Sequence, residues 1–217
     1  MKCRYKQKVQ EEAAQREIEV YGELTDQFLA FLDYSKGMAM HELFDHGKGR
    51  LDKMYDEHLM LMATMLNMYE DRAELDPDEY SLNTMGLYDR LLQNAGVDIE
   101  ALKKEHPIVD RYKEPALPKQ REFSNPIHQR RVTFVREFDR YVTTSIAAWL
   151  SYNNSTHGHG KMRLERAFHW LWSRYVKFCE LYLLTTKEGN ATMIFMISST
   201  KEYLKTLNLD ILREDAS

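Results

Sequence analysis

The sequence predicts an all-α fold, a helical bundle built from two related helical hairpins. Apolar residues recur every three or four positions through most of the chain, whereas no stretch alternates apolar and polar residues as a strand does. A ten-residue pattern occurs twice, at 46–55 and at 159–168, which indicates an internal repeat. An apolar content of 43% and a charged content of 29% are typical of a globular protein with a packed core.

The two copies of the repeated pattern share five identical residue types at equal spacing, namely His, Gly, Lys, Arg and Leu. Their first residues, His46 and His159, lie 113 positions apart, and three outlying pairs agree at the same offset: Asp26 with Asp139, Phe28 with Tyr141 and Tyr69 with Tyr182. If the repeat reflects a duplication, the two hairpins pack about an approximate twofold axis. The equivalent pairs are then Arg50 with Arg163, Leu51 with Leu164 and Tyr55 with Phe168. We expect both leucines to be buried, because each begins the apolar stripe of its helix.

In the first half, the apolar spacing predicts helices over 10–34 and about 38–44. A tight turn is predicted at 45–49, because two glycines there reach positive φ without strain. A long helix follows, with a stripe from Leu51 to Tyr69 that is rich in methionine.

An acidic connection over 71–79 comes next, and Asp76 and Pro77 suit the start of a further helix. Asn94-Ala95-Gly96 is predicted to end that helix. Four prolines then interrupt the periodicity, at Pro107, Pro115, Pro118 and Pro126. The predicted organisation is therefore an N-terminal half over 1–105, a linker over 106–127 and a C-terminal half over 128–217.

The second half repeats this plan. A helix is predicted from Val132 to Tyr152, and residues 151–160 form the most turn-like segment of the chain. A second apolar stripe runs from Leu164 to Tyr182, and a last helix follows Gly189-Asn190. The dihedrals of Gly47 and Gly160 test the duplication. If φ is positive at both, any Cβ there is strained and Gly→Val should unfold the hairpin, whereas ordinary helical dihedrals at either would make the repeat a coincidence of letters.

The composition indicates the cellular compartment in which the protein is expected. Two cysteines, Cys3 and Cys179, are too few for a disulfide framework, so a reducing compartment is expected. The charged N-terminus lacks the apolar segment of a signal peptide, and the apolar run 193–197 is too short to span a bilayer. We therefore expect a cytoplasmic protein with no membrane partner.

The net charge of −4 hides an asymmetry between the halves. Residues 1–108 carry 13 basic and 22 acidic side chains, or −9, whereas residues 109–217 carry 17 and 12, or +5. The basic half could meet an anionic partner, form a solvated surface or match the acidic half within the molecule. All three interpretations stay open at this level.

The segment around the first turn contains Ala39, His41, Glu42, Phe44, Gly47, Lys48, Arg50 and Leu51. These residues resemble a motif that reads A-L-H-E-x-F-G-F-G-K-K-R-L-E-R-F, found in short helical proteins from phages and prophages of Gram-positive bacteria. The second copy matches through Gly158, Gly160, Lys161, Arg163, Leu164, Glu165 and Arg166, but differs over 151–156. The resemblance implies a viral origin, and therefore a place in the cytoplasm of a bacterial host. It implies no particular reaction.

The first functional hypothesis is a non-enzymatic, phage-type accessory protein that binds a host or phage macromolecule. The expected effect of this binding is to inhibit a host or defence protein, as an anti-CRISPR protein does. The hypothesis rests on the viral resemblance, on helices rich in Met and Trp, and on the lack of a Walker loop, nucleophile elbow or Cys–His pair. No cofactor is predicted.

The alternative is a nucleic-acid-binding protein, because the turns are loosely similar to the helix-hairpin-helix element, in which a Gly-x-Gly turn meets a DNA phosphate. Gly47, Gly49, Gly158 and Gly160 are the turn glycines, and Lys48, Arg50, Lys161, Arg163 and Arg166 are the candidate anion-binding residues. In the structural interpretation, the glycines only close the hairpins and the arginines tie down carbonyls or acids.

Histidines surround both turns and raise the question of a metal site. His41, His46 and His58 lie near the first turn, and His157, His159 and His169 near the second. Their spacing does not match a His-Glu-x-x-His zinc motif, so loop capping or packing is the prediction and no metal is assigned. The acids Glu70, Asp71 and Glu74 lack a matching cluster on a second helix, which disfavours a helical nucleotide pyrophosphatase.

Overall fold

The computed structural model describes residues 28–57, 92–111, 126–184 and 187–207. Within these ranges the regular secondary structure is helical and includes no strand, so the predicted all-α class is confirmed. Helical segments cover 28–44, 48–57 and 92–94, followed by α4 (Ile99–Glu105), α5 (Pro126–His157), α6 (Lys161–Leu183) and α7 (Lys187–Thr206). None of the described helices is long and apolar enough to cross a membrane.

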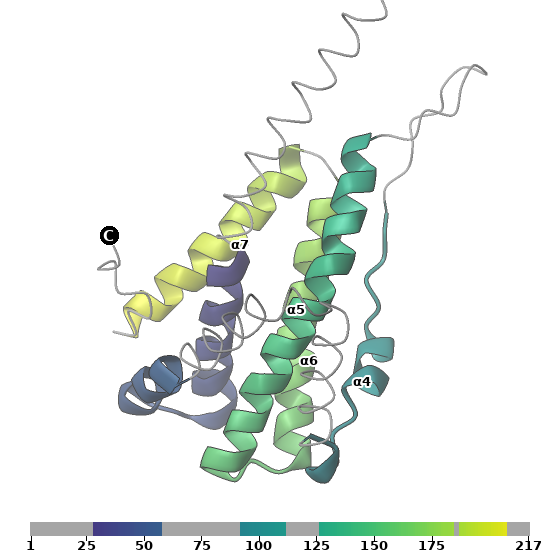
Figure 1. Ribbon diagram of the computed structural model, residues 1–217. Coiled ribbons are helices and arrows are strands. Elements are labelled where there is room, and N and C mark those ends of the chain that lie inside the picture. Colours follow the sequence, from purple (N-terminus) through teal and green to yellow (C-terminus); the bar gives the residue numbers. More distant parts are fainter. Residues whose placement is uncertain (1–27, 58–91, 112–125, 185–186, 208–217) are drawn as a thin grey trace, which may run out of the picture.

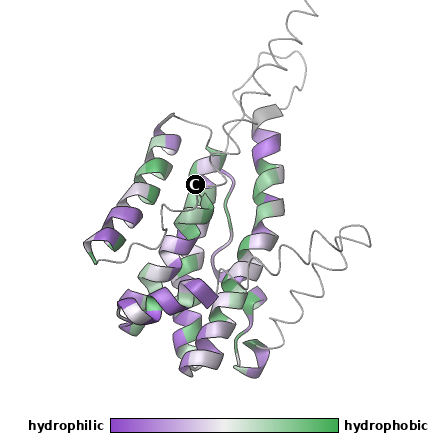
Figure 2. Cartoon of the chain, turned by 60° about the vertical axis from the view of Figure 1, so that its left-hand side comes forward, coloured by the Kyte–Doolittle hydropathy of each residue, from purple (hydrophilic) through white to green (hydrophobic). Residues whose placement is uncertain are grey.

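The described helices form a bundle around the antiparallel pair α5 and α6. Helix 28–44 and α7 lie along one side of this pair, and the short α4 lies on the other (Figure 1). Hydrophobic and hydrophilic residues share each long helix, which is the amphipathic pattern that the apolar spacing predicts (Figure 2). Phe28 joins the two halves of the sequence in one core, because its ring lies 5.0 Å from that of Phe138 and 4.4 Å from that of Phe178.

The first helix is longer than the sequence indicates. A break was expected at 35–37, between the predicted helices 10–34 and 38–44, but 28–44 is one continuous helix. Gly37 lies inside it and is buried. A glycine there costs about 1 kcal/mol of helix propensity, which the burial of Phe31, Leu32 and Met40 around it offsets.

Helix α5 also continues beyond its predicted end. The turn-like segment 151–160 is helical as far as His157, and the turn itself is reduced to 158–160. Asn153 Nδ2 donates to the Trp149 carbonyl (2.8 Å) and Ser155 Oγ to the Tyr152 carbonyl (3.2 Å), so these turn-forming side chains bond within the helix.

Further boundaries differ from the prediction as well. Helix 48–57 begins inside the predicted turn 45–49, and α5 begins at Pro126, inside the predicted linker 106–127. Helix α7 begins at Lys187, so Gly189 and Asn190 lie inside it rather than before it. Helix α4 was not predicted, because it is a single short stretch after the confirmed stop at Gly96 (φ 78). It begins at Asp98, whose side chain accepts a hydrogen bond from Ala101 N at 2.9 Å. Several predicted features lie outside the described residues: the start of helix 10–34, the methionine-rich stripe beyond Glu57, the acidic connection over 71–79 with the helix start at Asp76 and Pro77, and the prolines Pro115 and Pro118.

The two turns form the same backbone hydrogen bonds, residue for residue at the offset of 113. Before the turn the bonds are Asp45 N to His41 O and His46 N to Met40 O in the first copy, and Gly158 N to Asn154 O and His159 N to Asn153 O in the second. After it, the amides of Arg50 and Leu51 donate to Gly47 O, and those of Arg163 and Leu164 to Gly160 O. Two turns so far apart in the chain therefore have one geometry, and the twofold relation of the whole hairpins stays a prediction.

The leucines that follow the turns behave as predicted. Leu51 and Leu164 are both 0% exposed, and the equivalent Tyr55 and Phe168 are also buried. The glycine hypothesis is not met, because the positive φ values occur at Asp45 (56°) and Gly158 (66°) and not at Gly47 or Gly160. Gly160 is extended (φ −81°, ψ 175°), a conformation open to any residue.

In each turn the residue with positive φ, Asp45 or Gly158, therefore lies two positions before the glycine at which it was predicted. We expect Asp45→Gly to raise the free energy of unfolding by about 1 kcal/mol, and Gly158→Ala to lower it by about 1–2 kcal/mol, because only glycine tolerates the left-handed region well. Urea denaturation of both variants measures the effect. Gly160→Ala is the matched control and should be nearly neutral, since a Cβ there meets nothing within 4 Å. A larger loss at Gly160 than at Gly158 would contradict the assignment.

Candidate functional site

The fold brings the two turns together at one end of the bundle (Figure 1). The Phe44 ring lies 4.1 Å from the His159 ring, and the His46 ring lies 4.6 Å from that of His157 and 5.4 Å from that of His159. These are centroid distances of direct contact between rings. Two segments 113 positions apart in the sequence thus form one surface, which the pattern alone did not predict.

Trp149 supports this contact from inside the bundle. Its side chain is 0% exposed, its ring stacks on Phe44 at 6.3 Å, and its Nε1 donates to Met54 Sδ at 2.9 Å. Since Phe44 precedes the first turn and Met54 follows it, one α5 residue holds both arms of that hairpin. The relative position of the turns is therefore set by core packing.

The histidines between the turns are kept neutral by their surroundings. Burial, reinforced by His157, His159, Arg50 and Arg163, lowers the pKa of His46 to about 4. Burial also lowers the pKa of His157, with Arg50 and Lys53 acting in the same direction and Glu57 against it. Burial likewise lowers the pKa of His159, and Arg163 and Arg50 act in the same direction. At neutral pH the interface is thus a cluster of uncharged imidazoles flanked by two guanidinium groups.

Three ring nitrogens in this cluster are buried and have no hydrogen-bond partner within the described residues: His46 Nδ1, His157 Nε2 and His159 Nε2. The metal-ligand atoms that converge in the described part of the chain belong to other side chains, Glu105, His106 and His169. His58, a further candidate, lies outside the described residues. The predicted packing role fits His46 and His159, which are 2% and 4% exposed.

All five predicted anion-binding residues are exposed: Lys48, Arg50, Lys161, Arg163 and Arg166. Lys161 pairs with Glu165 at 3.6 Å, and Arg163 reaches His159 Nδ1 at 3.4 Å. Within the described residues, neither the Arg50 nor the Arg163 guanidinium bonds to an acid or a carbonyl oxygen. The interpretation in which these arginines tie down the hairpins therefore finds no contact to support it there.

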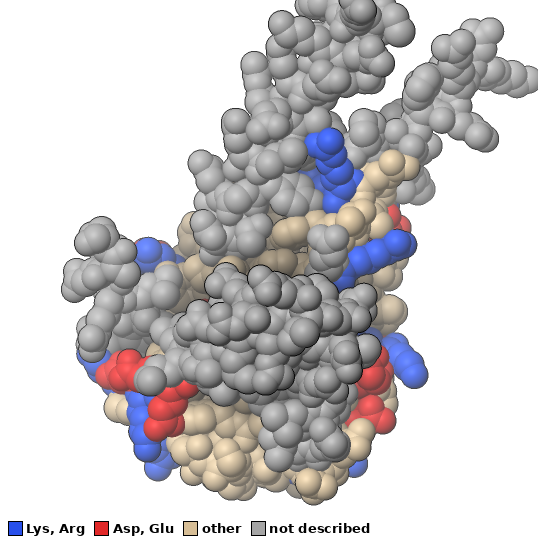
Figure 3. Space-filling model, in the orientation of Figure 1, with Lys and Arg blue, Asp and Glu red and all other residues tan. Residues whose placement is uncertain are grey.

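The backbone of the turns is open to an approaching molecule. A Cβ placed on Gly47, Gly158 or Gly160 would meet nothing within 4 Å. Gly49, predicted as a turn glycine, lies in the first turn of helix 48–57 instead. Gly160 begins α6 without a side-chain cap, so the first amides of that helix lack a side-chain acceptor. Exposed acids, among them Asp45 and Asp52, lie close by in the sequence. Basic and acidic side chains are mixed along both sides of the face drawn in Figure 3.

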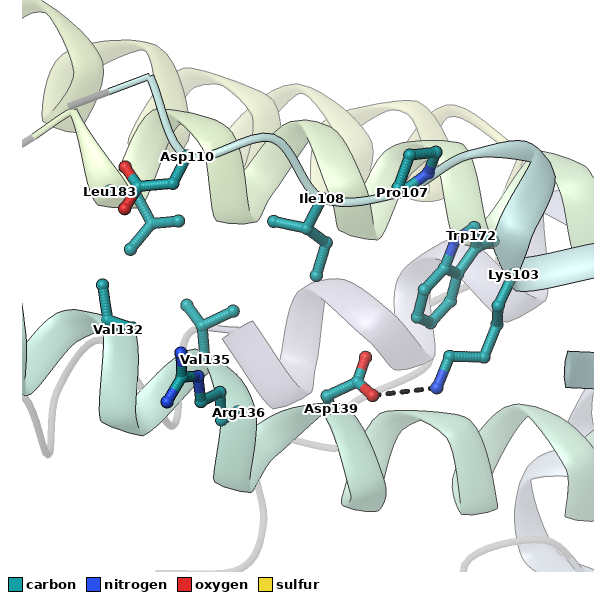
Figure 4. Close-up of a pocket in the computed structure, with 10 residues that line it drawn as sticks. All are labelled: Lys103, Pro107, Ile108, Asp110, Val132, Val135, Arg136, Asp139, Trp172 and Leu183. Carbon is teal, nitrogen blue, oxygen red and sulfur yellow. Dashed lines mark hydrogen bonds and ion pairs between the residues drawn. The ribbon is translucent and has the colours of Figure 1, made fainter.

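A cleft of about 440 Å³ lies elsewhere, between α4, residues 107–110, α5 and α6 (Figure 4). Its floor is apolar, with Ile108, Val135 and Trp172. Its rim is charged, but both acids there already have partners. Asp139 Oδ2 pairs with Lys103 Nζ at 2.8 Å, and Asp110 Oδ2 with His128 Nε2 at 2.9 Å. Sequence reasoning missed this cleft, because its lining comes from three separate segments.

Lys36 is a buried cation that the sequence did not predict. Lys36 is 0% exposed, and its Nζ donates to Asp33 Oδ1 (3.0 Å) and to Ser145 Oγ of α5 (2.7 Å). Burial lowers the pKa of Lys36, and Asp33 opposes that shift. The group joins helix 28–44 to α5 but lies away from any described cleft, so we assign it a structural role.

Comparison of the chain with protein-family models, with curated proteins and with solved structures found no match. The candidate site is therefore defined by its own geometry: two equivalent glycine turns, side by side, each followed by an exposed arginine.

Proposed function

We propose that the protein binds nucleic acid through the end of the bundle at which the two turns meet. One observation carries the proposal: Arg50 and Arg163 occupy equivalent places in two adjacent turns, are exposed, and engage no acid within the described residues. A pair of equivalent cationic turns matches the repeating charge of a phosphate backbone.

The chemistry of each turn supports a phosphate contact. The open glycine backbone lets a phosphate approach closely, and the uncapped amides at the start of α6 point their dipoles toward it. Lys48 and Lys161 add charge next to the same amides. Contacts of this kind position a protein on the backbone and read no bases, so the expected binding is largely independent of sequence.

The charge test uses the double variant Arg50→Ala/Arg163→Ala and fluorescence anisotropy of a labelled DNA duplex. Each lost phosphate contact should lower the slope of log K against log salt by about 0.9, so the double variant should lose about two in slope and bind more weakly at every salt concentration. Arg136→Ala/Lys177→Ala removes the same charge from exposed positions far from the turns, Lys177 being about 24 Å along α6 from Lys161.

The same experiment has an outcome that would overturn the proposal. If the two double variants lose affinity equally, binding depends on net charge and not on the turns. Absence of binding at low salt would remove the proposal altogether. Gly160→Val, which keeps every charge but fills the open space over the turn, should weaken binding without changing the salt slope.

Protein binding is the second candidate, and exposed apolar side chains on α7 favour it. Ile194 and Phe195 are 52% and 70% exposed at adjacent positions of that helix. Such side chains suit a non-enzymatic accessory protein of phage type that inhibits a host or defence protein. A pull-down from bacterial lysate separates the two candidates. A stoichiometric protein that wild type retains and Phe195→Ser loses would support this one, and recovery of nuclease-sensitive material alone would count against it.

A further inference from the structure

Three side chains that bind metals in proteins converge where α4 ends against α6. The ligand atoms of Glu105, His106 and His169 all lie within 4.8 Å of one another. His169 Nε2 is 3.4 Å from Glu105 Oε2, and the rings of His106 and His169 meet edge to face with centroids 5.4 Å apart. This cluster lies outside the two turns and was not singled out by the spacing of the histidines.

The backbone around the cluster is held in place. His106 caps α4 by donating its N–H to the Lys103 carbonyl, and its own carbonyl accepts a hydrogen bond from Trp172 Nε1 at 2.9 Å. Trp172 is 2% exposed and follows His169 by three positions on α6, so it lies on the same side of that helix. A buried indole therefore fixes the end of α4 beside the turn of α6 that carries His169.

The distances suit a tetrahedral cation. Bonds of about 2.0–2.1 Å to nitrogen and oxygen place two ligand atoms of a tetrahedral zinc ion about 3.3 Å apart. The Nε2–Oε2 distance of 3.4 Å is close to this value, and a ligand atom of the exposed His106 lies within 4.8 Å of both. Glu105 and His106 are exposed and His169 is half-buried, so an ion can enter and retain water at its remaining position.

We propose that Glu105, His106 and His169 bind one late first-row divalent cation, for which Zn²⁺ is the reference. Two imidazoles with one carboxylate are a donor set that such ions prefer, whereas Mg²⁺ and Ca²⁺ prefer oxygen alone. The ion links α4 to α6. Since α4 is seven residues long and buries only Ile99 and Leu102, this link should stabilise that part of the bundle. The site does not depend on the proposed nucleic-acid function.

The test measures binding of Zn²⁺ to the full-length, tag-free chain by competition with a zinc indicator. We expect one ion per chain and a melting temperature that rises with Zn²⁺ and not with Mg²⁺. His106→Gln and His169→Gln should each weaken binding at least tenfold and abolish the thermal shift. His128→Gln, which changes a histidine paired with Asp110 elsewhere, is the matched control and should bind like wild type.

Two results would overturn the site. The first is that wild type neither competes with the indicator for Zn²⁺ nor changes its melting temperature when Zn²⁺ is in about 100-fold excess over the protein. An excess of roughly this size is enough for a bound ligand to give a clear stability shift. The other is unchanged binding in the double variant His106→Gln/His169→Gln, which would place the ion elsewhere in the chain. Circular dichroism of the two single variants and of the double variant verifies that each one folds.

Discussion

Replacing Asp33 by Asn should lower the free energy of unfolding by about 3–5 kcal/mol, one of the largest single effects we expect in this protein. Lys36 is fully buried and donates to the Asp33 carboxylate at 3.0 Å, and the asparagine keeps the shape of the side chain but removes its charge. The Lys36 cation then lacks this counter-ion in a poorly solvated position. Urea denaturation of wild type and Asp33→Asn at pH 7 measures the loss.

The pH dependence of that variant identifies the cause. Burial already lowers the pKa of Lys36, and removal of Asp33 lowers it further. A lysine whose folded pKa lies below its unfolded value destabilises the fold most at low pH, and this penalty disappears as the pH rises toward the unfolded pKa of about 10.4. The loss in Asp33→Asn should therefore shrink as the pH rises from 7 to 10.

Lys36→Met in the same background is the control. The double variant Asp33→Asn/Lys36→Met removes both charges and should recover most of the lost stability, because an apolar side chain needs no counter-ion in that position. A loss below about 1 kcal/mol in Asp33→Asn, or no recovery in the double variant, would contradict the buried ion pair as the cause.

Acidification should loosen the contact between the two turns, and this is the second large effect. The folded pKa of His46 is about 4, well below its value of 6.5 in an unfolded chain, so the unfolded state binds the additional proton between these values. The free energy of unfolding must then fall as the pH is lowered from 6.5 toward 4. His46 alone should contribute on the order of 2 kcal/mol after allowance for solvent at this end of the bundle, and His157 and His159 act in the same direction.

Urea denaturation at pH 7, 6, 5 and 4 tests this expectation, and two variants distinguish His46 from the carboxylates that titrate in the same range. His46→Gln should flatten the curve between pH 6.5 and 4. Arg163→Gln should make it shallower, because it removes a cation that lowers the pKa of His46 and of His159. Identical curves for wild type and His46→Gln would show that the imidazole does not carry the effect.

The sequence by itself determined the helical class, the helices that follow both turns and the burial of Leu51 and Leu164. These features depend on local spacing, because the apolar positions of a helix show which of its faces is buried, whatever packs against that face. The stop at Gly96 is local as well, since the glycine adopts a φ of 78° that few other residues tolerate.

Only the tertiary structure decided how far two helices extend and which distant side chains meet. Burial of neighbouring side chains carries helix 28–44 through Gly37, and side-chain bonds to carbonyls carry α5 to His157, against the local preference for a turn. The contact of Phe44 with His159, the burial of Lys36 beside Ser145 and the convergence of Glu105 with His169 each join residues from separate helices. Local spacing carries no information on such pairs, because the partner of each face is selected by the packing of the whole core.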